Sequence, residues 1–528
     1  MNRLLMRANK KIGVSNAAAL LIGVSLIGQI LGFLRYKMVN ANFSELGPQS
    51  TDAYFAAFKI PDFFFFTLAA GALGVAFIPI LAERLEKGDR KSVWELTSSL
   101  MNLLSVVMFV VGVIMFVFAE PLISRIVAPN LPPEQLRNAV TIMRFISFNP
   151  MLFAVAGVIT STQQTFGRFF FYAVGPIFYN LAIIISIFVF RNNIGLVGLG
   201  IGALIGAVLQ LGVAFLGMAD TGFKWKPTIM WKSKDFKQIL RQLPPRSIDQ
   251  GVDSINSIVE TNLATRLGLG NVTYYENAYI LHTTPMLVIG TTIATAAFPK
   301  LTERLASGRT DLFRKDFLQI LRAIIWITVP VVVITYFTRG YLARLIFARG
   351  SSEIGLILGY LSIAIFFRTI YSIISRWFYA QKDTITPLIV SFFAIAFNIF
   401  LAVVLSRKEA YGIAGLAIAQ STVAFAEVMI LVLIMCVRDR KLFDARFLGG
   451  LVRILSVTGF SIVATFVMLG YLPLQVADTG LVLGVKLAVI SSVTLITHLI
   501  MSSVFNLNEA NAVMSRVKKT IYRPIRIN

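Results

Sequence analysis

Charged residues and cysteine are both scarce in this sequence of 528 residues. Only 14% of the residues are Asp, Glu, Lys or Arg, against about a quarter in soluble domains, so the composition excludes an ordinary soluble protein. The single cysteine, Cys436, excludes an internal disulfide and a thiolate metal site. The sequence also lacks a P-loop, a Gly-rich nucleotide fingerprint, a metal-ligand cluster and a convincing Ser-His-Asp set. We therefore expect no covalent chemistry, no ATP hydrolysis, no metal and no cofactor.

Long apolar stretches are abundant instead, because 56% of the residues are hydrophobic. A helix needs about 20 apolar residues to cross a bilayer, and such stretches recur along the whole chain. They predict an all-α polytopic membrane protein of about fourteen transmembrane helices, the first of them retained and not cleaved as a signal peptide. The predicted spans are residues 17–40, 53–81, 95–118, 139–161, 168–190, 195–217, 238–266, 273–298, 317–337, 354–378, 385–405, 412–436, 447–471 and 480–505.

The basic residues predict the orientation of these helices. The formal net charge is +23, but the Lys and Arg side chains lie in alternate short loops and form no single basic module, so nucleic acid is not an expected partner. By the positive-inside rule, both termini are cytoplasmic. Three arginines, Arg339, Arg344 and Arg349, fall on the wrong side, so either that outer loop is an exception or a span is misassigned there.

An internal repeat predicts two lobes. PILAERLEKG at residues 79–88 matches PKLTERLASG at 299–308, an offset of 220. Asn180 and Asn398 are 218 apart, and GLVGLGIGA from Gly195 matches GIAGLAIAQ from Gly412. Six spans separate each pair, so the repeat is parallel, as in many transporters. We predict six-helix lobes at residues 1–222 and 223–440, followed by two helices and a basic tail at 441–528.

Ionisable residues within predicted spans are candidate functional residues, because each costs about 2.5–3.5 kcal/mol to insert. Lys59 follows Asp52 by two helical turns, and Pro61 permits a kink before the FFFF run. Arg35 and Lys37 either face a cavity or extend to the membrane interface. The helix with Lys59 and Asp62 is either polar toward a cavity at its outer half and apolar below, or the two residues pair with each other or with a neighbour only to be tolerated in the membrane.

The second predicted lobe offers an acidic helix face. Asp253 and Glu260 are seven residues apart on the seventh span, and we expect them, with Asn398, to take part in ion coupling. Arg368 and Arg376 are cations that this face could need. His282 is either sensitive to protons or a neutral packing residue.

Several segments resemble one family. GQILGFLRYKMV, TDAYFAAFKIPDFF and AAGALGVAFIPILAE resemble the start of the MurJ (MviN) family of lipid II flippases, in the multidrug/oligosaccharidyl-lipid/polysaccharide exporter superfamily. YYENAY, AAFPKLTE and GIAGLAIAQ extend the resemblance over nearly the whole chain. The resemblance implies a fourteen-helix transporter with a central cavity between two lobes.

By this resemblance, Arg35, Lys59 and Asn180 match family residues that line the central cavity, and Asp52 matches a gate residue. We predict Arg35, Lys59, Asn180 and Arg368 as substrate-binding residues, and Asp52 and Asp62 as gate residues. The chain departs from the family by lacking charge at four positions, which are Gln29, Ala70, Asn277 and Ala278. Gln29 and Ala278 stand where the family has Arg, Ala70 and Asn277 where it has Glu and Asp, and Phe replaces an Arg pair after the proline. The loss of several cavity arginines implies a weaker grip on a pyrophosphate.

The leading hypothesis is therefore a flippase that moves undecaprenyl-pyrophosphate-linked lipid II across the bacterial cytoplasmic (inner) membrane by alternating access. A membrane potential or a monovalent cation or proton gradient would drive it. The expected partners are the lipid-linked precursor, membrane lipids and cell-wall synthesis proteins. Two alternatives stay open: a transport-inactive scaffold for envelope assembly, and an exporter of another lipid-linked glycan or of an amphipathic cation.

Overall fold

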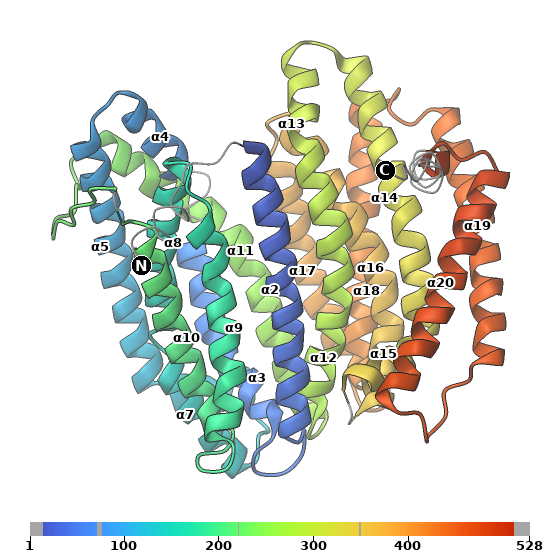
Figure 1. The fold of residues 1–528 in the computed structure, drawn as a ribbon, viewed down its shortest axis with the longest axis horizontal. Helices are drawn as coiled ribbons and strands as arrows, with labels where there is room; N and C mark the ends of the chain where they lie inside the picture. The colour runs from blue at the N-terminus through green and yellow to red at the C-terminus, as the bar shows by residue number, and fades with distance from the viewer. Residues whose placement is uncertain (1–13, 71–76, 220, 348–349, 512–528) are drawn as a thin grey trace, which may run out of the picture. The chain divides into compact units, whose positions relative to one another are not determined.

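The computed structural model describes residues 14–70, 77–219, 221–347 and 350–511. Within these ranges every regular element is a helix (Figure 1). The chain divides into two compact units, Met1–Thr273 and Tyr274–Asn528. The prediction of an all-α membrane protein is confirmed.

The first unit begins with α2 and ends in the first turn of α12. Its elements are α2 (Val14–Asn42), α3 (Thr51–Phe64), the π-helix η1 (Phe65–Ala70), α4 (Ile78–Glu86), α5 (Arg90–Val117), α6 (Ala119–Pro121), the π-helix η3 (Leu122–Val127), α7 (Pro133–Ile146), α8 (Asn149–Thr165), α9 (Phe170–Phe190), α10 (Val197–Leu216) and α11 (Lys234–Leu267).

The second unit holds most of α12 and all later helices. Its elements are α12 (Asn271–Pro285), the π-helix η4 (Met286–Thr291), α13 (Thr292–Ala306), α14 (Thr310–Phe337), α15 (Arg339–Ile346), α16 (Ser351–Ala380), α17 (Ile385–Leu405), α18 (Ile413–Arg438), α19 (Ala445–Tyr471) and α20 (Gly480–Val504).

Eleven helices in the described part of the chain are long and apolar enough to span a membrane. They correspond to the third to sixth and the eighth to fourteenth predicted spans. The three other predicted spans contain α2, α3 with η1, and α11, which are also helical. The total of fourteen spans stays a prediction. Large apolar side chains such as Phe393 and Phe400 on α17 are 67% and 61% exposed, as expected for a surface that faces lipid.

The glycine motif of α10 lets this helix pack closely on α9. Gly198, Gly202 and Gly206 recur every four residues along one face of α10. A Cβ atom on Gly206 would lie 2.9 Å from the ring of Tyr179, and one on Gly202 would clash with Ser186. Small residues at this spacing allow two membrane helices to approach closely. The motif therefore fixes the position of Tyr179.

Helices in the two halves of the sequence match in length, and one pair also starts at the offset of the sequence repeat. Helices α5 and α14 each have 28 residues and begin at Arg90 and Thr310, an offset of 220. Helices α9 and α17 each have 21 residues, and η1 and η4 each have six. The seventh predicted span, α11, contacts α3, η1 and η3 and belongs to the first compact unit. The lobe boundaries at residues 222 and 440 stay predictions.

The last two helices are joined by polar contacts at buried positions. Ser461 of α19 bonds His498 of α20 at 3.0 Å, and Thr465 bonds Thr494 at 2.8 Å. The indole N–H of Trp326 on α14 donates to Ser502 Oγ at 2.8 Å. Hydrogen bonds between membrane helices contribute about 0.6 kcal/mol each, so this set holds α19 and α20 in register against α14.

Two of the exceptional arginines have local partners. Arg344 donates to the carbonyl of Gln475 at 2.6 Å and also to that of Val476, in the connection between α19 and α20. Arg339 donates to the carbonyl of Tyr336 at 2.6 Å and lies over its ring. Arg349 lies outside the described residues. Both arginines belong to the short helix α15, where these bonds give them a structural role.

Candidate functional site

Asp52 caps the N-terminus of α12. Its Oδ2 accepts from the backbone N–H of Gly270 at 2.7 Å. Its Oδ1 accepts from the backbone N–H and the hydroxyl of Thr273, at 2.8 and 2.6 Å. Gly270 occupies the capping position directly before α12 and has no side chain of its own to accept these bonds. Asp52 therefore supplies from α3 the carboxylate that a capping residue normally provides.

The Asp52 carboxylate is enclosed at this helix end. It is 1% exposed and bonds backbone amides. The role of Asp52 as a gate residue stays a prediction. A second bond joins the same two segments, because the hydroxyls of Thr51 and Thr273 lie 2.8 Å apart. The backbone amides of a helix N-terminus are a ready partner for a carboxylate, but sequence spacing gives no sign of which helix end lies nearby.

Lys59 joins α3 to α11. Its Nζ donates to Ser257 Oγ at 2.8 Å. Lys59, Asp62 and Asp253 line a cavity of about 280 Å³, which Phe66, Ser254 and Ser257 also line. The charged side chains of two helices thus meet at one cavity, and substrate binding by Lys59 stays a prediction.

The irregular turn after Lys59 brings α11 close. Pro61 lies inside α3, and four residues later the chain widens into η1. Proline removes a backbone donor, and π-turns often mark functional sites in helices. A Cβ atom on Gly251 of α11 would lie 2.6 Å from Thr67 Oγ1 of η1. The chain after Pro61 is therefore irregular: it forms the π-helix η1, which packs closely on Gly251 of α11.

Arg35 lies among tyrosines. Its guanidinium is 5.3 Å from the ring centre of Tyr36 and 5.9 Å from that of Tyr179, within the range of cation–π attraction. The Asp62 carboxylate contributes to the electrostatic field at this guanidinium. Asp62 is therefore the charged residue that links the surroundings of Arg35 to the cavity at Lys59.

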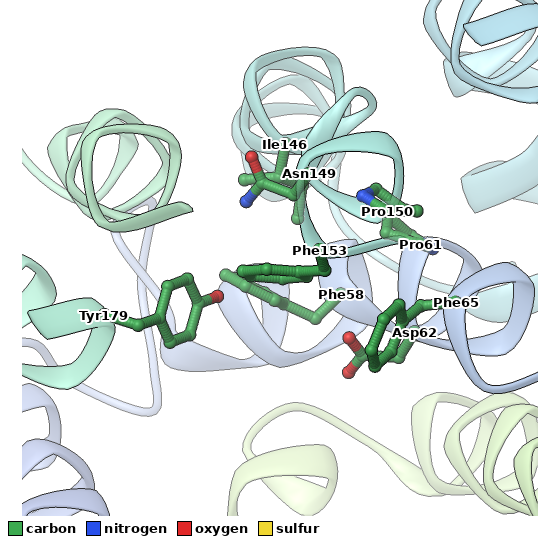
Figure 2. A pocket seen from close by; sticks show the side chains of 9 residues that line it. All are labelled: Phe58, Pro61, Asp62, Phe65, Ile146, Asn149, Pro150, Phe153 and Tyr179. Carbon is green, nitrogen blue, oxygen red and sulfur yellow. The ribbon is translucent and has the colours of Figure 1, made fainter. Parts of the chain in front are cut away.

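Tyr179 and Asp62 also line a much smaller pocket. Figure 2 shows the Tyr179 hydroxyl pointing toward the rings of Phe58 and Phe153. Tyr179 meets Phe153 edge to face, with ring centres 5.2 Å apart. The volume of about 10 Å³ is close to the minimum for one water molecule. This packing fixes the tyrosine that faces Arg35.

The two acids predicted for ion coupling differ in environment. Asp253 is exposed and lines the cavity at Lys59. Glu260 is 3% exposed and accepts from Asn256 Nδ2 at 3.0 Å. Both lie on α11, whereas Asn398 is buried on α17 in the second unit. Of these residues, the structure brings only Asp253 to the cavity.

Asn180 has a local partner in α9. Its side-chain amide donates to the carbonyl of Pro176, one turn earlier, at 3.2 Å.

The four positions at which family charges are missing differ in environment. Asn277 and Ala278 are buried, and Gln29 is exposed on α2, whereas the side chain of Ala70 lies outside the described residues.

Arg368 belongs to a buried network in the second unit. Its Nη1 donates to Glu427 Oε2 at 2.8 Å, and Glu427 Oε1 accepts from the Ser391 hydroxyl at 2.7 Å. Ser391 in turn bonds the hydroxyl of Tyr371 at 2.9 Å. The sequence analysis missed Glu427. The signal was available, because a carboxylate within an apolar span indicates a functional or paired residue.

His282 fits the packing alternative in part. The side chain is 1% exposed and packs on Tyr279 at 5.4 Å between ring centres. Neither ring nitrogen has a hydrogen-bond partner in the described part of the chain. It is therefore packed, but not hydrogen-bonded as a typical membrane histidine would be.

These features define a class of protein. Its membrane helices carry costly charges that meet at a cavity and at a helix end, and intramembrane charges of this kind mark transport pathways. The class is a polytopic membrane transporter and not an enzyme.

The family follows from comparison with known proteins. The family model described as "Lipid II flippase MurJ" matches residues 47–478. The chain belongs to the MurJ family.

Curated relatives carry the same description. A protein of Borreliella burgdorferi named "Probable lipid II flippase MurJ" is 24% identical over 405 residues, which cover 75% of this chain and 78% of the relative. A protein of Buchnera aphidicola with that name is 23% identical over 505 residues, covering 92% and 96%.

Solved structures share the fold. "Lipid II flippase MurJ, inward closed conformation" matches with a TM-score of 0.76 and 23% identity, covering 92% of this chain and 98% of that one. An inward-facing multidrug resistance MATE family transporter matches with a TM-score of 0.67 and 16% identity, covering 83% and 98%.

Proposed function

We propose that this chain moves lipid II, a pyrophosphate-linked lipid precursor of peptidoglycan, across the bacterial inner membrane by alternating access. The observation that carries the proposal is the cavity of about 280 Å³ at Lys59. Lys59 offers a positive charge beside an apolar ring, Phe66, and so suits a ligand with a charged head and a hydrocarbon chain. The names of the relatives support the same substrate.

Arg35 completes the head-group site in this proposal. It lies near Asp62, which lines the cavity at Lys59. When a pyrophosphate enters, Arg35 of α2 and Lys59 of α3 are the cations that bind it in this proposal. Lys59 binds as a point charge, from a position at which its Nζ donates to Ser257 Oγ. Arg368, which is paired with Glu427 in the second unit, is the third predicted contact.

Asp52 acts as the gate. It ties α3 to the first turn of α12 through three hydrogen bonds. Alternating access requires that one such contact opens while the substrate leaves. Because all three donors, two backbone amides and the Thr273 hydroxyl, belong to one helix end, the contact is lost as a unit when α12 moves away from Asp52.

Ion coupling involves the acids of α11. Asp253 lines the cavity, where its carboxylate would bind a cation or a proton during the transport cycle. Glu260 and Asn398 are the further coupling residues in this proposal. The driving force is a membrane potential or a gradient of a monovalent cation or protons.

A second candidate function is export of an amphipathic cation. Asp62 and Asp253 both line the cavity, and of the charged side chains described there only Lys59 is positive. A cavity with this charge would attract a lipophilic cation. Efflux of such a dye from cells or vesicles would favour this function over lipid transport.

Complementation tests the proposal. Cells depleted of their own lipid II flippase would express this chain, and lipid II exposed on the outer face of the membrane would be measured. We expect the chain to restore exposure and growth. The matched control is Lys224→Ala, which changes an exposed lysine far along the chain from α3. Failure of the abundant, membrane-inserted wild type to restore lipid II exposure would contradict the proposed function.

A further inference from the structure

A second, larger cavity lies within the second unit. Its volume is about 670 Å³, within the range of small-molecule sites. The first half of α14, the connection before α19 with the start of that helix, and the segment after α20 surround it. It is remote in sequence from the cavity at Lys59, because every residue that lines the Lys59 cavity belongs to the first unit.

Basic side chains dominate the lining of this cavity. The cavity is lined by five cations, Arg314, Lys315, Arg322, Lys441 and Arg446. It is also lined by three carboxylates, Asp311, Asp444 and Glu509. We call the three residues Lys315, Lys441 and Arg446 the basic trio.

The carboxylates at the cavity already have partners. Arg314 donates to Asp439 at 2.6 Å and to Asp311 at 3.0 Å. Arg322 pairs with Glu509. Asp444 caps α19 by accepting from the backbone N–H of Phe447 at 2.7 Å. In the residues that the structure describes, the basic trio forms no ion pair. The five cations and three carboxylates leave the lining with a net formal charge of +2, and the basic trio is available to an anionic ligand.

An apolar wall adjoins these charges. Leu318, Ala323, Ile327 and Phe447 line the cavity together with Trp326, whose indole N–H is held by Ser502. Lys315 lies in the second turn of α14, Lys441 in the connection before α19, and Arg446 at the start of α19. Of the apolar residues, Phe447 follows Arg446 on α19, and the other four lie farther along α14 than Lys315. This order of a charged end and an apolar wall matches a phospholipid at the membrane interface.

We propose that this cavity binds the phosphate of an anionic membrane phospholipid, with the basic trio as its contacts and Trp326 and Phe447 against the glycerol backbone and upper acyl chains. A lipid is favoured over a soluble phosphate because of the apolar wall. The ligand is a resident lipid that holds α14 and α19 together, and it is not the transported substrate. The inference therefore stands apart from the proposed function.

Spin-labelled phosphatidylglycerol tests the site. The full chain would be reconstituted in phosphatidylcholine nanodiscs, and the fraction of immobilised phosphatidylglycerol would be measured by electron paramagnetic resonance. Three neutralised contacts near a membrane surface should weaken association by about tenfold or more. We expect this loss in the triple variant Lys315→Gln, Lys441→Gln, Arg446→Gln.

The matched control neutralises exposed lysines elsewhere, with Lys224→Gln and Lys232→Gln. An equal loss in this control would overturn the site, because general surface charge would then explain the binding. The charge-conserving variant Lys441→Arg, Arg446→Lys should keep the lipid. This charge-conserving variant keeps the proposal testable if the triple variant does not fold.

Two further outcomes are decisive. Full binding by a folded triple variant would overturn the proposal. Displacement of the label by millimolar glycerol phosphate as effectively as by unlabelled phosphatidylglycerol would show a soluble-phosphate site and overturn the lipid assignment. Transport of lipid II by the same variants is a separate readout, so failure here is distinguishable from failure of the proposed function.

Discussion

Arg368 and Glu427 lie 59 residues apart in the sequence and form an ion pair of 2.8 Å between α16 and α18. The Glu427 side chain is 1% exposed, and that of Arg368 is 19% exposed. Ser391 of α17 bonds the same carboxylate, so three helices of the second unit meet at Glu427.

Breaking this pair should destabilise the second unit. Glu427→Ala leaves Arg368 without its carboxylate, and loss of one partner of a buried pair costs about 3–5 kcal/mol. We expect a large fall in the midpoint of thermal unfolding in detergent. Glu353→Ala, at an exposed position in α16, should have little effect. If Arg368→Met combined with Glu427→Leu is no more stable than Glu427→Ala, the pair is not the cause.

Removing the cap from α12 should loosen the gate. Asp52→Ala deletes the acceptor of three hydrogen bonds, and loss of a helix cap costs about 0.5–2 kcal/mol. We expect faster amide hydrogen exchange at Gly270 and Thr273. Ser50→Ala removes the cap of α3 itself and should leave that exchange unchanged. Unaltered exchange in Asp52→Ala would show that the carboxylate does not hold this turn.

Acid should weaken the turn between α16 and α17. Partial burial opposes ionisation of Asp383, but hydrogen bonds from Thr386 and Arg438 lower its pKa to about 2. The unfolded carboxyl has a pKa of about 3.9. The folded pKa is depressed, so this contribution to stability is present above about pH 4 and is lost as the pH falls toward 2. Asp383→Asn should remove that part of the pH dependence of unfolding; identical acid profiles would contradict this.

Reporter fusions should locate both termini in the cytoplasm. We expect reporters at Lys87, Lys234 and Arg440 to score inside, because these connections hold most of the basic residues. Reporters at Leu131 and Asp478 should score outside. An outside score at Lys234 would overturn the assignment of the two lobes.

The sequence predicted the regular parts of the fold because long apolar stretches and repeated motifs can be recognised without knowing the tertiary packing. The offset of 220 found in PILAERLEKG recurs in the starts of α5 and α14. The partners of the charged residues depend on tertiary packing instead. The sequence marked Asp52 as unusual, but only the fold places the end of α12 beside it. Likewise, Arg368 was predicted as a substrate contact without its partner Glu427.

The most direct test of the account is lipid II translocation by the purified chain in proteoliposomes, with Lys59 as the variable residue. Transfer of lipid II between leaflets would be measured by the access of an added enzyme to its head group. Wild type and Lys59→Arg should translocate, since both keep a positive charge at the cavity, whereas Lys59→Ala should lose most activity at equal protein content. Equal translocation by Lys59→Ala, Arg35→Ala and the wild type would contradict the head-group site, and no translocation by the wild type would contradict the proposed function.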